Sequence, residues 1–369
     1  MIYLDNAATT LRKPASVARA MSWALENLGS PGRGGHAAAM RAASEAFACR
    51  CLAAKLFGVN DPACVVFCMN ATHALNLAIK SIVRPGDRVV ISGYEHNAVL
   101  RPLKALGAEI HIARGPLFEP VATLEAFHRL LTPGTRAAII NHVSNVFGCV
   151  QPLEEVAALC REREMPLIVD ASQSAGILPL DLSGLGAAFI AMPGHKSLYG
   201  PQGTGLLLCA HRTIPLLEGG SGSDSENPAM PEDLPDRLEA GTHNMPGIAG
   251  LRQGLTFVAQ QGPDRVLKHE RALTQLAATL LREHPRIRLY ASEDPAQQTG
   301  VLSFSVLGQD PERVAEFLSQ RGIAVRPGLH CAPLAHETAS STGTVRMSFS
   351  VFNTRREVLD AVRVLQENF

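Results

Sequence analysis

The 369-residue chain has no excess of charge of either sign, because 34 basic and 34 acidic residues give a formal net charge of zero. A nucleic acid or an anionic membrane surface is therefore not an expected partner, and we expect the chain to bind a small molecule. Long apolar runs are also missing, since no uninterrupted segment approaches the roughly 18 residues of a membrane-spanning helix. The first residues, MIYLDNAATT, lack the charged and apolar regions of an export signal. We therefore expect a soluble, cytoplasmic protein.

Cysteine occurs eight times, but in no pattern typical of a metal site. Cys49 with Cys51, and Cys64 with Cys68, lack the repeated short spacing of structural zinc sites, so we expect no metal. Without an export signal, the cysteines are expected to be reduced thiols, most of them small core residues.

Short apolar runs alternate with amphipathic segments over most of the first 210 residues. The runs are CVVFC, DRVVIS, AEIHIA, AAIINHVS, PLIVDAS, AAFIAM and TGLLLC. This alternation predicts an α/β fold with a mostly parallel sheet that is covered on both faces and binds ligands at the carboxyl ends of its strands. Residues 219–237 are rich in Gly, Ser and Pro and predict a long loop, and helical patterns cover roughly 246–284. The remainder predicts a smaller α+β domain.

The stretch PGHKSLYGPQGTG, residues 193–205, places Lys196 directly after an apolar run. A lysine that starts near the interior either extends to water or serves as a nucleophile or as the anchor of an aldehyde cofactor. Asp170 ends another apolar run and, taken alone, would be a turn or cap residue. One strand–helix–strand step or a hairpin brings Asp170 and Lys196 to neighbouring strand ends. A carboxylate and a lysine are the two groups that pyridoxal phosphate needs from its protein.

Two further segments offer contacts for such a cofactor. CMNATHALNLAIKSI provides Asn70 and Thr72 as helix caps near free N–H groups that bind phosphate, although an ordinary capped helix would look the same. His96 follows the run DRVVIS, where its ring would stack on a flat cofactor, although a single loop histidine often has no such role.

Nine ordered motifs span nearly the whole chain: YLDNAATT, NATHALNLA, YEHNAVLRP, HVSNVFGCVQP, VDASQSAG, GHKSLYGPQGTG, EAGTHN, RPGLHCAP and VRMSFSVFNT. Together they resemble the class V aminotransferase superfamily of fold-type I pyridoxal-phosphate enzymes, and within it the group II cysteine desulfurases and selenocysteine lyases. The resemblance implies a seven-stranded, mostly parallel sheet in a large cofactor-binding domain, residues 15–250. It also implies a smaller α+β domain, residues 1–14 and 251–369, that carries Cys331 and Arg346.

The same resemblance implies roles for single residues. Lys196 would bind the cofactor covalently and move the α-proton of the substrate, Asp170 would pair with the pyridinium nitrogen, and His96 would stack on the ring. Asn145 would contact the ring oxygen or the substrate carboxylate. The remaining cofactor contacts would come from Ala71, Thr72, Gln173, His195 and Thr242. Thr242 of the EAGT motif would reach the phosphate from the other subunit, which implies a homodimer.

Arg346 lies in the alternating run TVRMSFSVF, residues 344–352, which predicts a strand with Arg346, Ser348 and Ser350 on one face. An ordinary solvent-facing arginine is one interpretation. An arginine fork also binds a carboxylate through two parallel hydrogen bonds, and the resemblance places Arg346 at the substrate carboxylate, with Arg326 as a further candidate.

Cys331 lies beside His330 in the Pro- and Gly-containing segment AVRPGLHCAPLAHE rather than in an apolar run. Arg326 and His330 would favour its thiolate, the nucleophilic form. The resemblance implies that L-cysteine becomes L-alanine and that Cys331 holds the sulfur as a persulfide for a possible protein acceptor. The alternatives are selenocysteine lyase activity on L-selenocysteine, or a transaminase or epimerase in which Cys331 is not catalytic. Leu329, His243 and an extra residue in GHKSLYGP depart from the familiar pattern, so the physiological substrate and the sulfur acceptor stay open.

Overall fold

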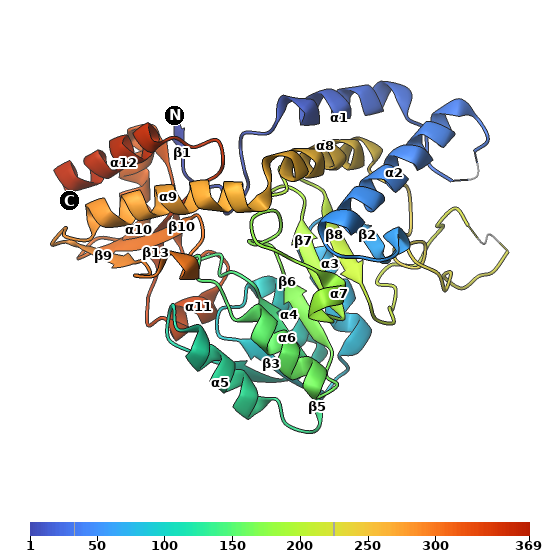
Figure 1. The fold of residues 1–369 in the computed structure, drawn as a ribbon, viewed down its shortest axis with the longest axis horizontal. Coiled ribbons are helices and arrows are strands. Elements are labelled where there is room, and N and C mark those ends of the chain that lie inside the picture. The colour runs from blue at the N-terminus through green and yellow to red at the C-terminus, as the bar shows by residue number, and fades with distance from the viewer. Residues whose placement is uncertain (33, 224–225) are drawn as a thin grey trace.

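The computed structural model describes residues 1–32, 34–223 and 226–369, and a seven-stranded sheet lies at its centre (Figure 1). The strand order is β2-β8-β7-β6-β5-β3-β4, and only β8 runs antiparallel to its neighbours. The strands are β2 (Val65–Cys68), β3 (Arg88–Ser92), β4 (Glu109–Ala113), β5 (Thr135–Asn141), β6 (Leu167–Asp170), β7 (Phe189–Pro193) and β8 (Gly205–Cys209). Each of the seven predicted apolar runs forms one of these strands, which confirms the predicted mostly parallel α/β sheet.

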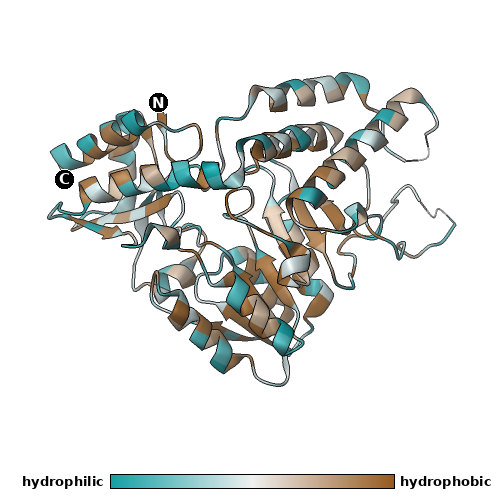
Figure 2. Cartoon of the chain, in the orientation of Figure 1, coloured by the Kyte–Doolittle hydropathy of each residue, from teal (hydrophilic) through white to brown (hydrophobic). Residues whose placement is uncertain are grey.

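Residues that alternate along the central strands pack on opposite faces of the sheet. Val90 and Ile140 contribute to a core with α2, α5, α6, α7 and α8, whereas Val89 and Ile139 contribute to a core with α3 and α4. The helices of this part of the chain are α1 (Ala15–Asn27), α2 (Ala37–Leu56), α3 (Ala71–Ile82), α4 (Asn97–Leu106), α5 (Pro120–Leu130), α6 (Leu153–Glu162), α7 (Leu182–Leu185) and α8 (Met245–Gln261). Because both faces are covered, the strands near the centre of the sheet are mostly apolar, as their colouring in Figure 2 shows.

A second, four-stranded antiparallel sheet has the order β12-β13-β10-β9. Its strands are β9 (Ile287–Tyr290), β10 (Val301–Val306), β12 (Arg326–Gly328) and β13 (Thr344–Ser348), and the helices near it are α9 (Pro263–Leu281), α10 (Pro311–Gln320), α11 (Pro333–Thr338) and α12 (Arg355–Asn368). Short 3₁₀ helices cover Pro62–Cys64 and Pro295–Gln297. β13 ends earlier than the predicted strand 344–352 because the backbone turns: Asn353 Oδ1 accepts a hydrogen bond from Ser350 N (2.9 Å), just before α12.

The first residues of the chain join this second sheet region (Figure 1). β1 (Ile2–Tyr3) pairs in parallel with β11 (Ile323–Ala324), and Asp5 forms an isolated bridge with Ser348. The start of the chain is therefore held beside β13, the strand that carries Arg346.

The predicted loop 219–237 has no helix or strand among its described residues, and positions 224 and 225 lie outside them. In the described part of the chain, no helix has both the length and the apolar character that crossing a membrane requires.

Candidate active site

A cavity of about 110 Å³ lies at the carboxyl ends of β5, β6 and β7, beside the first residues of α3 and α4. It brings together eight predicted site residues, namely Ala71, Thr72, His96, Asn145, Asp170, Gln173, His195 and Lys196. Four others do not line it: Thr242, Arg326, Cys331 and Arg346. The position agrees with the expectation that ligands bind at the carboxyl ends of the parallel strands.

Asp170 and Lys196 follow neighbouring strands, as the sequence predicts. β6 and β7 are parallel, with Asp170 opposite Ala191, and Lys196 follows shortly after β7. The Asp170 side chain is buried, and its Oδ1 accepts a hydrogen bond from Ser172 N (2.9 Å). Desolvation lowers the pKa of Lys196 to about 8, although the Asp170 carboxylate opposes this shift. A neutral amine is therefore accessible near neutral pH, which covalent binding of an aldehyde requires.

The start of α3 supplies hydrogen-bond donors to the cavity. Asn70, not Thr72, is the N-cap, because Asn70 Oδ1 accepts from His73 N (2.9 Å) while Thr72 lies in the first turn. The backbone N–H groups of Ala71 and Thr72 have no partner among the residues that the structure describes. Two free donors at the positive end of a 12-residue helix suit a phosphate group.

His96 is the N-cap of α4 and presents its ring to the same cavity. Its Nδ1 accepts a hydrogen bond from Ala98 N (3.0 Å), which places the ring hydrogen on Nε2 in the neutral form. Burial lowers the pKa of His96, whereas the nearby Asp170 carboxylate acts in the opposite direction. A neutral aromatic ring is suited to stacking on a flat cofactor.

Glu95 is a site-associated residue that the sequence did not single out. It is fully buried, and its Oε1 accepts hydrogen bonds from Ser92 Oγ (2.6 Å) and Asn141 N (2.7 Å), which joins the ends of β3 and β5. Burial raises the pKa of Glu95 to about 8. In the sequence Glu95 looks like an ordinary loop glutamate. Only its position in YEHNA, directly before His96, could have marked it as a residue near the site.

These groups fit pyridoxal phosphate, on the observation that a buried carboxylate, a lysine of lowered pKa and unpaired helix N–H groups border one cavity. Gln173 lies at its edge and donates from Nε2 to Ala7 O (3.0 Å). His195 Nδ1 contacts Thr9 Oγ1 (3.0 Å). No group of three or more His, Cys, Asp or Glu side chains within the described ranges is arranged to hold a metal ion.

Thr242 lies in a different, larger hollow of about 780 Å³. Asn70 and His195 line both this hollow and the smaller cavity, so the two adjoin. Thr242 is exposed and does not line the smaller cavity of its own chain.

Cys331 lies in the loop between β12 and α11, and its side chain is exposed. His330 and Cys331 have φ values of 52° and 56°, in the left-handed region that residues with side chains rarely adopt. Both carbonyl groups are bound near the cavity: the cavity residue Asn145 donates from Nδ2 to His330 O (2.8 Å), and Asn97 N, next to the cavity residue His96, donates to Cys331 O (2.9 Å). The loop is thus attached to the wall of the cavity through Asn145.

The expected help of His330 to the Cys331 thiolate is not supported. Burial lowers the pKa of His330 to about 2, so its ring is neutral and contributes no positive charge. Its Nε2 instead contacts Thr344 Oγ1 (3.0 Å). Arg326, whose side chain is about half exposed, is the remaining cation of the pair that the sequence suggested.

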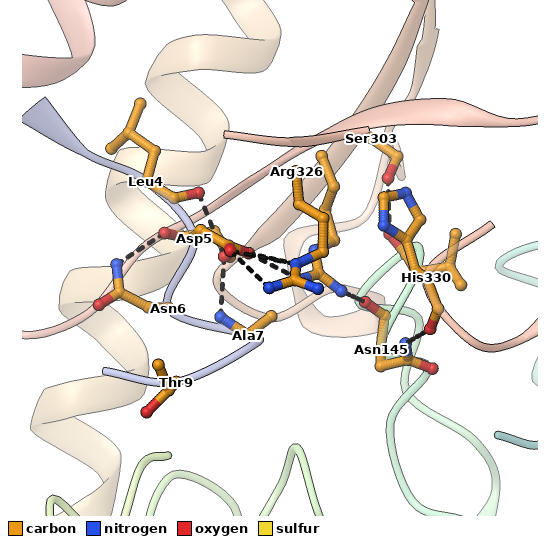
Figure 3. Close-up of polar contacts among 12 residues, drawn as sticks. Leu4, Asp5, Asn6, Ala7, Thr9, Asn145, Ser303, Arg326 and His330 are labelled. Atoms are coloured by element: carbon orange, nitrogen blue, oxygen red, sulfur yellow. Dashed lines mark hydrogen bonds and ion pairs between the residues drawn. The ribbon is translucent and has the colours of Figure 1, made fainter. Parts of the chain in front are cut away.

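Arg346 is not a solvent-facing arginine, since its side chain is only 2% exposed. Its Nη2 lies 2.9 Å from Asp5 Oδ1, and its Nη1 donates to Asn145 O (2.7 Å). Figure 3 shows Asp5 beside Arg326, with Asn145 and His330 on the other side of the cluster. Asp5 was not predicted to have a role, although it lies in the motif YLDNAATT.

Comparisons with known proteins agree in family and fold. The sequence model of the family described as aminotransferase class-V matches residues 2–361. A probable cysteine desulfurase of Methanothermobacter thermautotrophicus is 33% identical, over 99% of this chain and 94% of the relative. A probable cysteine desulfurase of Mycolicibacterium paratuberculosis is 31% identical over 100% of this chain, which spans 56% of that relative's length. The apo structure of a cysteine desulfurase from Thermococcus onnurineus matches with a TM-score of 0.91 at 30% identity, over 99% of this chain and 94% of that chain.

Proposed function

Because the chain belongs to the aminotransferase class-V family, a pyridoxal-phosphate-dependent family, we propose that it is a cysteine desulfurase that leaves a persulfide on Cys331. The observation that carries the proposal is the placement of Cys331. All eight cysteines lie in the described ranges, and Cys331 alone among them is exposed. Its backbone is bound to Asn97, next to the cavity residue His96. An accessible thiol thus lies on a loop attached to the site where the substrate would be held.

Different groups around the cavity would bind different parts of the cofactor. Asp170 would hold a protonated ring nitrogen, His96 would cover one ring face, the start of α3 would bind the phosphate, and Lys196 would form the covalent bond. When bound, pyridoxal phosphate supplies an electron sink for the substrate's Cα.

Lys196 and Cys331 would perform the proton and sulfur transfers. Lys196 Nζ, with a pKa lowered to about 8 by desolvation, is suited to accept and return a proton near neutral pH. The Cys331 thiolate attacks the sulfur of L-cysteine, an S–S bond forms, and the C–S bond breaks with its electron pair left on carbon. That carbon takes a proton, so L-alanine leaves and Cys331 keeps one added sulfur atom. Arg346 would bind the α-carboxylate, with Asn145 beside it.

We further propose a homodimer and a protein sulfur acceptor. Thr242 is exposed and lines the hollow next to the cofactor cavity, which supports a contact with the phosphate from a second subunit rather than from its own chain. Cys331 is exposed, which supports delivery of its sulfur to another protein.

The decisive experiment incubates the purified, cofactor-loaded protein separately with L-cysteine and L-selenocysteine. Alanine is measured first, and the mass of the peptide that contains Cys331 is measured next. We expect alanine from L-cysteine and one added sulfur atom on Cys331. C331S should lose both, whereas C51S, which changes a partly buried cysteine of α2, should keep both.

Other outcomes would replace the proposal. Alanine from L-selenocysteine alone, without a Cys331 adduct, would assign selenocysteine lyase activity. If C331S still released alanine and sulfur from L-cysteine, Cys331 would not be the nucleophile. No alanine from either amino acid would direct the search to transaminase and epimerase substrates.

A further inference from the structure

Two arginines lie directly opposite each other on neighbouring strands of the second sheet. β12 and β13 are antiparallel, and Arg326 lies directly opposite Arg346 in their register. Like charges at directly opposite positions repel each other, and here one of them is buried, with Arg346 only 2% exposed. Such a pair requires a negative charge between its two members.

Asp5 supplies that charge from the far end of the chain (Figure 3). Its carboxylate makes one contact with Arg346, at 2.9 Å from Nη2. It makes more contacts with Arg326, at 3.2 and 3.1 Å from Nε and at 3.1 Å from Nη2. Asp5 therefore contacts two nitrogens of the half-exposed Arg326 and one nitrogen of the buried Arg346.

The cluster is not fully satisfied by Asp5. Two guanidinium groups and one carboxylate leave one positive charge unbalanced. In the described part of the chain, the buried Arg346 Nε has no hydrogen-bond partner, and neither does the buried Asn145 Oδ1 nearby. An unpaired donor beside an unbalanced positive charge suits one further carboxylate.

We propose that Asp5 is an internal competitor of the substrate, and hence an affinity-determining residue of the site. Its carboxylate occupies Arg346 when no amino acid is bound. When the α-carboxylate of the substrate binds Arg346, Asp5 stays with Arg326 alone. The proposal rests on the proposed function only in taking an amino acid as the substrate.

Carboxylate affinity is then expected to rise with the net positive charge of the Asp5–Arg326–Arg346 cluster. D5N keeps the shape of the side chain but adds one unit of positive charge to the cluster. R326Q removes one unit and leaves Asp5 to pair with Arg346 alone. A residue that merely positioned Arg346 would give a different result, because both substitutions would then weaken binding.

The test measures the dissociation constant of propionate for the cofactor-loaded protein by ligand-observed NMR titration. Propionate has a carboxylate but neither an amine nor sulfur, so it binds without reacting, and propionamide is its uncharged control. We expect D5N to bind propionate about three- to tenfold more tightly than the unmodified protein, and R326Q to bind it about three- to tenfold more weakly. The double variant D5N/R326Q should return to within about twofold of the unmodified protein.

The proposal is overturned if D5N binds propionate no more tightly than the unmodified protein, or if R326Q binds it no more weakly. It is also overturned if propionamide responds to the substitutions as propionate does. A double variant as weak as R326Q would show that Arg326 itself binds the carboxylate, which also overturns it. Thermal unfolding checks each variant, and if D5N does not fold, D5S, which also removes the carboxylate, takes its place with the same expected result. Because propionate carries no sulfur, these results do not depend on whether the protein desulfurates L-cysteine.

Discussion

Burial shifts the pKa values of titratable side chains around the cavity in the direction that favours their neutral forms. The pKa of Lys196 is lowered to about 8, and that of His330 to about 2, while the pKa of Glu95 is raised to about 8. Desolvation is the largest cause in each case because the charged form loses its water. Arg346, which is buried and contacts Asp5 Oδ1 at 2.9 Å, is the cation best placed to hold an ionic ligand.

The lowered pKa of Lys196 predicts how cofactor uptake depends on pH. Nζ must be neutral to attack an aldehyde, so the rate at which the apoprotein takes up pyridoxal phosphate should rise about tenfold per pH unit and level off above about 8. Stopped-flow absorbance between about pH 6 and pH 10 measures this rate.

K13R is the matched control, because Lys13 also has a pKa lowered to about 8 by burial and donates to His195 O (2.6 Å). K13R should leave the midpoint of the pH dependence unchanged, and K196A should abolish the absorbance change of cofactor uptake. A midpoint near the ordinary lysine value of 10.5 would show that Lys196 is not desolvated in solution.

At the scale of the element, α8 fixes the segment that follows Lys196. The helix passes so close that a Cβ on Gly254 would lie 2.2 Å from Leu198 O and 2.7 Å from Gly200 N. Both contacts are with backbone, which cannot move aside as a flexible side chain would. The absence of a side chain at position 254 therefore sets how closely α8 packs against the segment after Lys196.

G254A should destabilise the protein, although alanine favours helices over glycine by about 1 kcal/mol. The overlap with backbone should cost more, with a net loss of about 2 kcal/mol or less and weaker cofactor binding. Chemical denaturation and a cofactor titration measure the two effects. Q260A, at an exposed position of the same helix, should change neither, and a G254A protein more stable than the unmodified one would contradict the close contact.

The elements were predictable to the extent that local pattern determines them. Each apolar run became a strand because alternating residues are buried on both faces of the sheet. The place of β8 between β7 and β2 could not be predicted, since antiparallel insertion leaves no mark in the run itself. Asp5 was missed for a related reason: its partner Arg346 is 341 positions away, and no spacing joins the two. The neutral state of His330 depends on tertiary burial, which its loop sequence does not show.

At the scale of the whole molecule, one buried carboxylate connects three distant segments. Glu239 Oε1 accepts from Arg50 Nη1 of α2 (2.8 Å) and from Phe67 N of β2 (2.6 Å), and Oε2 contacts His243. The Arg50 guanidinium also lies 4.1 Å from the centre of the Phe67 ring. The segment that carries Thr242 is thereby attached to the central sheet.

E239Q should lower the free energy of unfolding by about 3 kcal/mol at neutral pH, because it leaves the buried Arg50 without its charge partner. Burial would raise the pKa of Glu239, but hydrogen bonds from His243 and Arg50 lower it overall from the ordinary 4.5. The ionised carboxylate therefore stabilises the fold above 4.5, and this contribution is lost as the pH falls through the lowered pKa.

Denaturant unfolding of E239Q and the unmodified protein should thus show a difference at neutral pH that shrinks in acid. E109Q serves as the comparison, because the Glu109 side chain is 61% exposed and its substitution should change stability little. A difference of equal size at both pH values would mean that the charge of Glu239 does not matter.

The position of Asp5 also sets an order of events during synthesis. Every residue that lines the small cavity lies between Asn70 and Lys196, so these side chains have all left the ribosome while the second sheet is still unmade. Asp5 emerges before the cavity-lining residues, and Arg346 emerges after them. A nascent chain therefore exposes every residue that lines the small cavity before the Asp5–Arg346 ion pair can form.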